Sequence, residues 1–161
     1  RAPRSAPAPT LPATELPSIE KQFLGLLLKY PRFIAPTAAV VEPEDFLDPR
    51  SRAISVHLFE VYKTADSLDP SSLVGDFDDQ HLVNAITACA VEEFDDEQVD
   101  EFWSDTVHRF KRDALTRRME AVKQELAAAA KKGNEELCAR LAGTLEVLVK
   151  ERATTAVERA S

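Results

Sequence analysis

The sequence predicts an all-α fold: a bundle of about five to six helices followed by an antiparallel helical hairpin. Composition favours helices, because only four of the 161 residues are glycine, aromatic residues make up 7%, and 30% of the residues are charged. A long uninterrupted stretch predicts the hairpin, since no proline or glycine occurs between Asp95 and Gly133. Along that stretch apolar residues recur at steps of three and four, the spacing of one helix face.

The first 17 residues predict a linker. They hold five of the ten prolines, and a Pro/Ala tract of this kind cannot bury enough apolar surface to fold. We interpret residues 1–17 as an interdomain linker that buries little, and the missing initiating Met suggests that more protein precedes it. Residues 18–112 are predicted to form the bundle and residues 113–161 the hairpin.

The first half of the bundle begins at Ser18, a predicted N-cap for a helix over residues 19–30. Its apolar stripe predicts a central position in the bundle; the stripe is Ile19, Phe23, Leu26, Leu27 and Tyr30. A proline at position 31 ends this helix, and a short helix is expected after Pro36 and before Pro43. Phe46, in the loop that follows, is expected to fill the core.

Three further helices are predicted from Asp caps. Asp48-Pro49 and Asp69-Pro70 place an N-cap before a first-turn proline, and either Asp78 or Asp79 caps the next segment. The expected buried faces are Ile54, Leu58, Val61 and Tyr62 in the first of these helices, and Leu82, Val83, Ile86 and Ala90 in the last.

The long helix is predicted to start at Asp95, with Gln98 completing a capping box, and its first half carries an aromatic inner face that includes Trp103. The seam of the hairpin is predicted from a ladder of apolar residues; these are Leu115, Met119, Val122, Leu126 and Ala129 on one side, and Leu137, Leu141, Leu145 and Leu148 on the other. Gly133 suits the left-handed position after a helix, and Asn134 suits the next N-cap.

Charge is distributed unevenly along the chain. The net charge is −8, but residues 18–108 carry six Lys and Arg against 19 Asp and Glu, whereas residues 109–161 carry 12 against eight. An acidic bundle argues against direct nucleic-acid binding, which requires a basic footprint. The basic start of the hairpin, near Arg109 and Arg112, is interpreted as a solvated face or as a surface for an acidic partner.

The sequence shows no pattern for catalysis, a metal or a cofactor. There is no phosphate-binding glycine loop, the three histidines are far apart, and the aspartate clusters lack the spacing of a calcium loop. We therefore expect a chain that is not an enzyme and needs no cofactor. The two isolated cysteines, Cys89 and Cys138, fit a reducing cytoplasm, and no apolar run is long enough for a membrane span.

Three stretches resemble one known family. They are Glu20 with the run Phe23 to Pro31, the motif Glu44-Asp45-Phe46-Leu47-Asp48-Pro49 with Arg52 and Ile54, and the Ala-rich turn Ala129 to Asn134. The chain is similar to the C-terminal helicase-binding domain of bacterial DnaG-type DNA primases, from about Ser18 to Arg152. The resemblance implies a non-catalytic fragment of a primase that docks on the N-terminal domain of the replicative helicase in the cytoplasmic, nucleoid-associated replisome. It also leaves single-strand DNA-binding protein as a possible further partner.

Two other interpretations stay open. The N-terminal domain of the replicative helicase has a similar fold and a similar Asp-Phe–Pro pattern, although it usually has His-Arg where this chain has Ser51-Arg52. A homodimerising structural hairpin, with its leucine seam completed by a second copy, is the other alternative.

The partner-binding residues are expected on the hairpin, either outside its seam or, for Leu137, beside the turn where the seam covers its residues least. Leu137 and Val149 are the candidate apolar anchors, although Leu137 could equally serve only to close the hairpin tip. The polar residues expected around them are Lys131, Lys132, Glu136, Arg140, Glu151 and Arg152.

Overall fold

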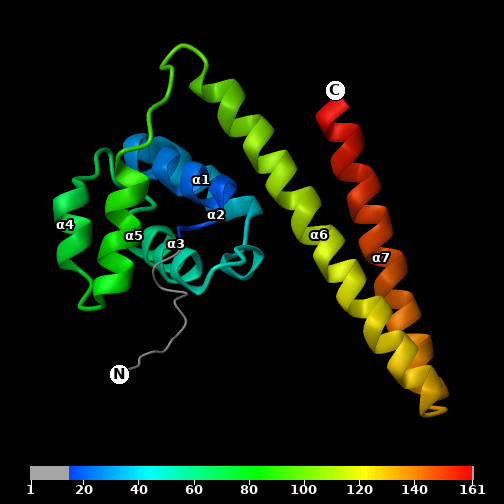
Figure 1. Cartoon of the computed structure of the whole chain (residues 1–161). Coiled ribbons are helices and arrows are strands. Elements are labelled where there is room, and N and C mark those ends of the chain that lie inside the picture. Colours follow the sequence, from blue (N-terminus) through cyan, green and yellow to red (C-terminus); the bar gives the residue numbers. More distant parts are fainter. Residues whose placement is uncertain (1–14, 161) are drawn as a thin grey trace, which may run out of the picture. The chain divides into compact units, whose positions relative to one another are not determined.

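The computed structural model describes residues 15–160, with side chains through Thr155, and the secondary structure within this range consists of helices joined by turns and loops, without a strand (Figure 1). In chain order the elements are α1 (Ser18–Lys29), the 3₁₀ helix η2 (Pro31–Phe33), α2 (Ile34–Val40), the 3₁₀ helix η3 (Pro43–Asp45), α3 (Pro49–Val61), α4 (Pro70–Gly75), α5 (Gln80–Ala90), α6 (Val99–Lys131) and α7 (Glu135–Ala160). The predicted all-α fold is confirmed. Residues 1–14 of the predicted linker lie outside the described range.

The chain divides into two compact units between Trp103 and Ser104. The first unit contains α1 to α5 and the first turn of α6, and the second contains the rest of α6 together with α7. The subdomain limits 18–112 and 113–161 stay a prediction. None of the described helices is both long and apolar enough to cross a membrane.

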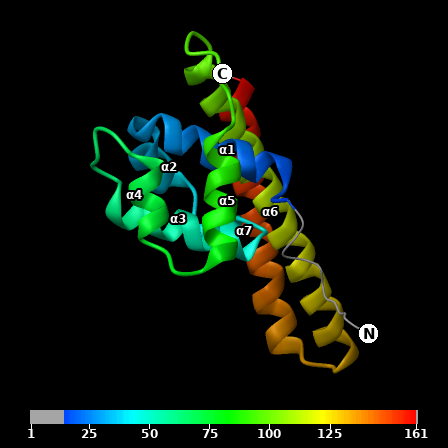
Figure 2. The same cartoon turned by 60° about the vertical axis from the view of Figure 1, so that its left-hand side comes forward.

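Helix α1 lies at the centre of the first unit, as its apolar stripe predicts. Every residue from Phe23 to Leu28 is buried, and α1 contacts both α3 and α5 (Figure 2). Gly25 is required where α1 meets α5, because a Cβ atom there would lie 2.6 Å from the carbonyl oxygen of Cys89. The absence of a side chain therefore sets how closely these two helices can approach.

A buried carboxylate holds the loop before α3. Glu20 in α1 is 1% exposed, and its carboxylate accepts the backbone N–H of Leu47 at 2.5 Å and that of Asp48 at 3.2 Å. From the other side, the Arg52 guanidinium donates to the carbonyl oxygens of Phe46 and Leu47, both at 2.8 Å. Phe46 is 1% exposed, which confirms that it fills the core.

The predicted Asp caps are confirmed. Asp48, Asp69 and Asp79 each accept the backbone N–H two residues further along, at 2.9, 3.0 and 2.8 Å respectively. Pro49 and Pro70 occupy the first helical position after their caps, where a missing N–H costs no intrahelical bond. Asp79, and not Asp78, caps α5.

The starts of the first two helices differ from the prediction. Ser18 is the first residue of α1, and Pro17 occupies the N-cap position without a side-chain cap. Helix α2 begins at Ile34, so that Pro36 lies within its first turn, where a helix tolerates proline. Leu16 is only 5% exposed, so the expectation that residues 1–17 bury little is wrong at this position.

Two predicted buried positions are also wrong. Val61, at the last position of α3, is 54% exposed, because its helix ends there. In α5 the buried face is rotated about the helix axis relative to the predicted one. Ala90 is exposed, whereas Ala85 and Cys89 are buried. The alanine-rich sequence of α5 offers little contrast between its faces, so periodicity alone could not orient it.

The acidic segment before α6 is anchored to the first unit by specific contacts. Asp95 caps a turn by accepting the Glu97 N–H at 3.0 Å, and α6 itself begins at Val99, later than predicted. Asp96 accepts a hydrogen bond from the hydroxyl of Tyr30, which raises the pKa of that tyrosine. This segment therefore has a structural role that composition alone did not predict.

Trp103 contributes to the first unit, as predicted, although it is only half-buried. Its ring stacks on Phe33 with centroids 5.3 Å apart, and its indole N–H donates to the hydroxyl of Thr37 at 2.9 Å. Thr37 is fully buried, so this hydrogen bond satisfies a polar group that water cannot reach.

Cysteine reactivity follows from burial. Cys89 is 1% exposed, and burial raises the pKa of its thiol to about 12, whereas Cys138 is half-buried on α7. Because only the thiolate is alkylated and the thiol is buried, Cys89 is expected to stay unreactive at pH 8 in the folded protein. We expect iodoacetamide at pH 8 to label Cys138 alone, as measured by peptide mass spectrometry, and both cysteines in urea. Equal labelling of the folded chain would contradict the placement of α5.

The turn of the hairpin has the predicted glycine geometry. Gly133 has a φ of 71°, in the left-handed region. The N–H of Asn134 donates to the Ala129 carbonyl and the N–H of Gly133 to the Ala130 carbonyl, which together form a Schellman motif at the end of α6. The side chain of Asn134 then accepts the N–H of Leu137 at 3.1 Å and caps α7.

The predicted seam of the hairpin is confirmed. Helices α6 and α7 lie side by side and antiparallel (Figures 1 and 2), and Leu115, Met119 and Leu148 form one buried cluster. Val122 and Leu145 pack against that cluster, and Leu141 and Ala129 are also buried. Steps of three and four residues on each helix therefore produce a single apolar interface.

Candidate docking surface on the hairpin

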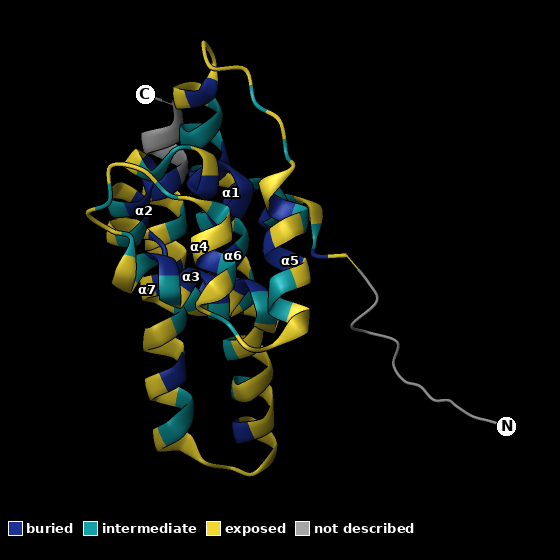
Figure 3. Ribbon diagram, turned by 90° about the vertical axis from the view of Figure 1, so that its left-hand side faces the viewer, coloured by how far each residue is buried: buried dark blue, intermediate teal, exposed yellow. Residues whose placement is uncertain are grey.

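The hairpin tip presents cations around a half-buried leucine. Lys131, Lys132, Glu136 and Arg140 are all exposed, and no ion pair involves the three cations within the described part of the chain. Leu137 lies in the first turn of α7 and is half-buried, so its side chain keeps some apolar surface open to solvent. Figure 3 shows the turn itself as exposed.

A separate patch lies further along α7. Val149 is 44% exposed, Glu151 is exposed and Arg152 is half-buried. Val149 and Arg152 contribute to a surface hollow of about 380 Å³, which is also lined by Arg112, Thr116 and Ala153. The lining combines two arginines with Val149 and Ala153, which suits an acidic side chain beside an apolar one, although Arg112 also pairs with Asp113 at 3.6 Å.

The structure therefore divides the predicted docking residues into two patches. We call the set Lys131, Lys132, Glu136, Leu137 and Arg140 the tip patch, and the set Val149, Glu151 and Arg152 the distal patch. Leu137 and Val149 are about 18 Å apart along α7 at a rise of about 1.5 Å per residue. One continuous contact with a partner would have to extend along about half of α7 to include both of these residues.

Sequence reasoning missed some exposed residues of the second unit. Val147 is 55% exposed, more than the predicted anchor Val149, and Arg112 and Thr116 line the distal hollow. The exposure of Val147 could have been predicted from the leucine spacing of α7, because this residue does not share the helix face of the seam positions 141, 145 and 148. No comparable signal existed for the hollow, which requires residues from both helices.

The first unit contains a cluster of titratable side chains that sequence spacing did not connect. Asp76, after α4, pairs with the His57 Nε2 at 2.8 Å and accepts the Tyr62 hydroxyl at 3.0 Å. The contact with His57 is the main reason why the pKa of Asp76 lies below its usual range. The cluster joins α3 to the end of α4. Within the described residues no group of three metal-ligating side chains is arranged to hold a metal ion.

Comparison with known families identifies one match. Residues 20–152 match the family model described as DNA primase DnaG DnaB-binding, a range that includes most of the chain and parts of both compact units. No curated protein and no solved structure matches the chain.

Proposed function

Because the chain belongs to the DnaB-binding domain family of the DNA primase DnaG, we propose that its hairpin docks on the N-terminal domain of the replicative helicase DnaB. The family match over residues 20–152 is the observation that carries this proposal. Docking would couple primer synthesis to unwinding at the replication fork in the bacterial cytoplasm. The chain would be a non-catalytic fragment of a primase, with primer synthesis performed by other domains.

The tip patch is the proposed centre of the contact. Protein interfaces are commonly organised around a few apolar anchors inside a polar rim. Leu137 supplies apolar surface, and Lys132 and Arg140 supply cations that need not break an internal ion pair before they meet a partner. The distal patch is the second candidate, because its hollow offers two guanidinium groups beside Val149.

Charge reversal tests the tip patch in the full chain. The double variant Lys132→Glu with Arg140→Glu is expected to weaken binding to the DnaB N-terminal domain by about tenfold at low salt, with unchanged helicity. The effect should shrink at high salt, because exposed charges are screened. Isothermal titration calorimetry measures the affinity, and circular dichroism measures the helicity.

A matched control variant and a variant of the distal patch show whether a loss of affinity is specific to the tip patch. Lys63→Glu with Lys123→Glu changes the net charge equally at exposed sites outside both patches, and should change affinity less than about twofold. Arg112→Glu with Arg152→Glu tests the distal patch together with the hollow beside it. If both patch variants bind with full strength, the docking surface does not lie at either patch.

Two further partner predictions can be tested with the same protein. We propose single-strand DNA-binding protein as a second partner, tested by the same calorimetry. We expect no direct binding to nucleic acid, because residues 18–108 carry 19 acidic side chains against six basic ones. Fluorescence anisotropy with a labelled single strand measures this, and tight binding at physiological salt would contradict it.

A further inference from the structure

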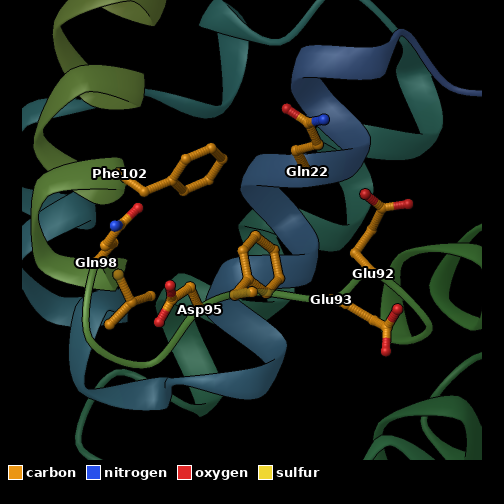
Figure 4. Close-up of a pocket in the computed structure, with 8 residues that line it drawn as sticks. Gln22, Glu92, Glu93, Asp95, Gln98 and Phe102 are labelled. Atoms are coloured by element: carbon orange, nitrogen blue, oxygen red, sulfur yellow. The ribbon is translucent and has the colours of Figure 1, made fainter.

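The first unit contains a pocket that the proposed docking role does not use. It lies among α1, the acidic segment after α5, and the first turns of α6, and it has a volume of about 180 Å³ (Figure 4). The pocket is lined by Gln22, Glu92, Glu93, Phe94, Asp95, Gln98, Val99 and Phe102. A cavity of this size suits a single side chain better than a folded element.

Two aromatic rings line the pocket. The centroids of Phe94 and Phe102 are 5.5 Å apart, and their planes are inclined by 57°. Both residues are half-buried, so part of each ring is available to a ligand. The face of an aromatic ring carries partial negative charge, which attracts a cation placed within about 6 Å of the ring centre.

The charged residues of the pocket are all acidic. Glu93 and Asp95 are exposed, and neither forms an ion pair within the part of the chain that the structure describes. Glu92 pairs with Lys21 at 3.7 Å, but Lys21 does not line the pocket, and no lining residue is cationic. The acidic side chains and the aromatic rings of the pocket therefore favour a cationic ligand.

The same unit already contains this kind of contact. The Arg32 guanidinium lies 4.6 Å from the ring centroid of Phe33 and 5.6 Å from that of Tyr30, and it pairs with Asp100 at 3.3 Å. An arginine over aromatic rings, held by an aspartate, is the arrangement that the pocket could complete with a residue from outside.

We propose that this pocket receives an arginine side chain from a basic segment of a protein partner. The guanidinium is planar and weakly hydrated, so it stacks on phenylalanine rings better than a lysine ammonium does. Its five N–H donors suit the acidic lining, where Asp95 lies beside Gln98 in Figure 4, and the amide oxygens of Gln22 and Gln98 are additional acceptors. This site is separate from the hairpin and needs no helicase, so the two proposals can fail independently.

Peptide titration of the full chain tests the proposal. The probe is acetyl-Gly-Arg-Gly-amide, compared with the same peptide carrying Lys or Gln, and the readout is the ¹H–¹⁵N spectrum of the protein. At low salt we expect shifts at residues 92–98 and 102, a dissociation constant on the order of 1–10 mM for the Arg peptide, weaker binding of the Lys peptide, and none of the Gln peptide.

Two variants that remove the same number of negative charges distinguish binding in the pocket from nonspecific attraction to the acidic surface. Glu93→Gln with Asp95→Asn removes two charges from the pocket, while the Asn oxygen can still accept the N–H of Glu97. Asp78→Asn with Glu97→Gln removes two exposed charges that do not line it. We expect the pocket variant to weaken Arg-peptide binding at least about fivefold and the control variant less than about twofold.

Several outcomes would overturn the proposal. These are equal weakening by both variants, equal binding of the Arg and Lys peptides, shifts located outside the pocket, or no shift at all. Shifts of the pocket amides on dilution without peptide would identify a second copy of this chain as the occupant, which would also overturn it.

Discussion

Replacing Leu27 by Ala is expected to lower the free energy of unfolding by about 2–5 kcal/mol. Leu27 is 0% exposed and lies in α1, the helix that contacts both α3 and α5. The substitution removes apolar contacts and leaves a cavity that the surrounding helices can only partly fill. Urea denaturation followed by circular dichroism measures the change.

Leu47 provides the matched control. It carries the same side chain in the same unit but is 52% exposed, and only its backbone is held, by Glu20 and Arg52. Replacing it by Ala should change stability by less than about 0.5 kcal/mol. If both substitutions cost the same, α1 does not form the core described here.

Gly25→Ala is expected to destabilise the protein by about 1–3 kcal/mol, although alanine favours helices over glycine by about 1 kcal/mol. The added methyl group would lie 2.6 Å from the Cys89 carbonyl oxygen, which belongs to the backbone of α5 and cannot rotate away. The two helices must therefore separate, which weakens the packing between α1 and α5. Thermal and urea denaturation measure the loss.

Gly143→Ala is the opposite case. Gly143 lies within α7 and is exposed, and a Cβ atom there would meet nothing within 4 Å. The substitution should stabilise the protein by about 0.5–1 kcal/mol, through a smaller loss of chain entropy on folding. A stabilising effect at Gly25 as well would disprove the close approach of α1 and α5.

The sequence by itself determined the features that depend on nearby residues. The caps at Asp48, Asp69 and Asp79, the left-handed Gly133 and the seam of the hairpin were all predictable. Capping hydrogen bonds join residues two or three positions apart. A repeat of apolar residues at steps of three and four shows which face of its helix is apolar. Neither the caps nor the seam therefore requires knowledge of the rest of the chain.

Only the tertiary structure decided which residues meet across the chain. Glutamate is a residue type that usually lies at the surface. Glu20 is nevertheless buried, and its carboxylate accepts hydrogen bonds from the backbone N–H groups of Leu47 and Asp48. Gly25 and Gly143 are indistinguishable as single helical glycines, and differ because another backbone approaches only the first. The predicted docking residues likewise separated into two patches, because distance along a helix, and not residue type, determines which side chains can share a contact.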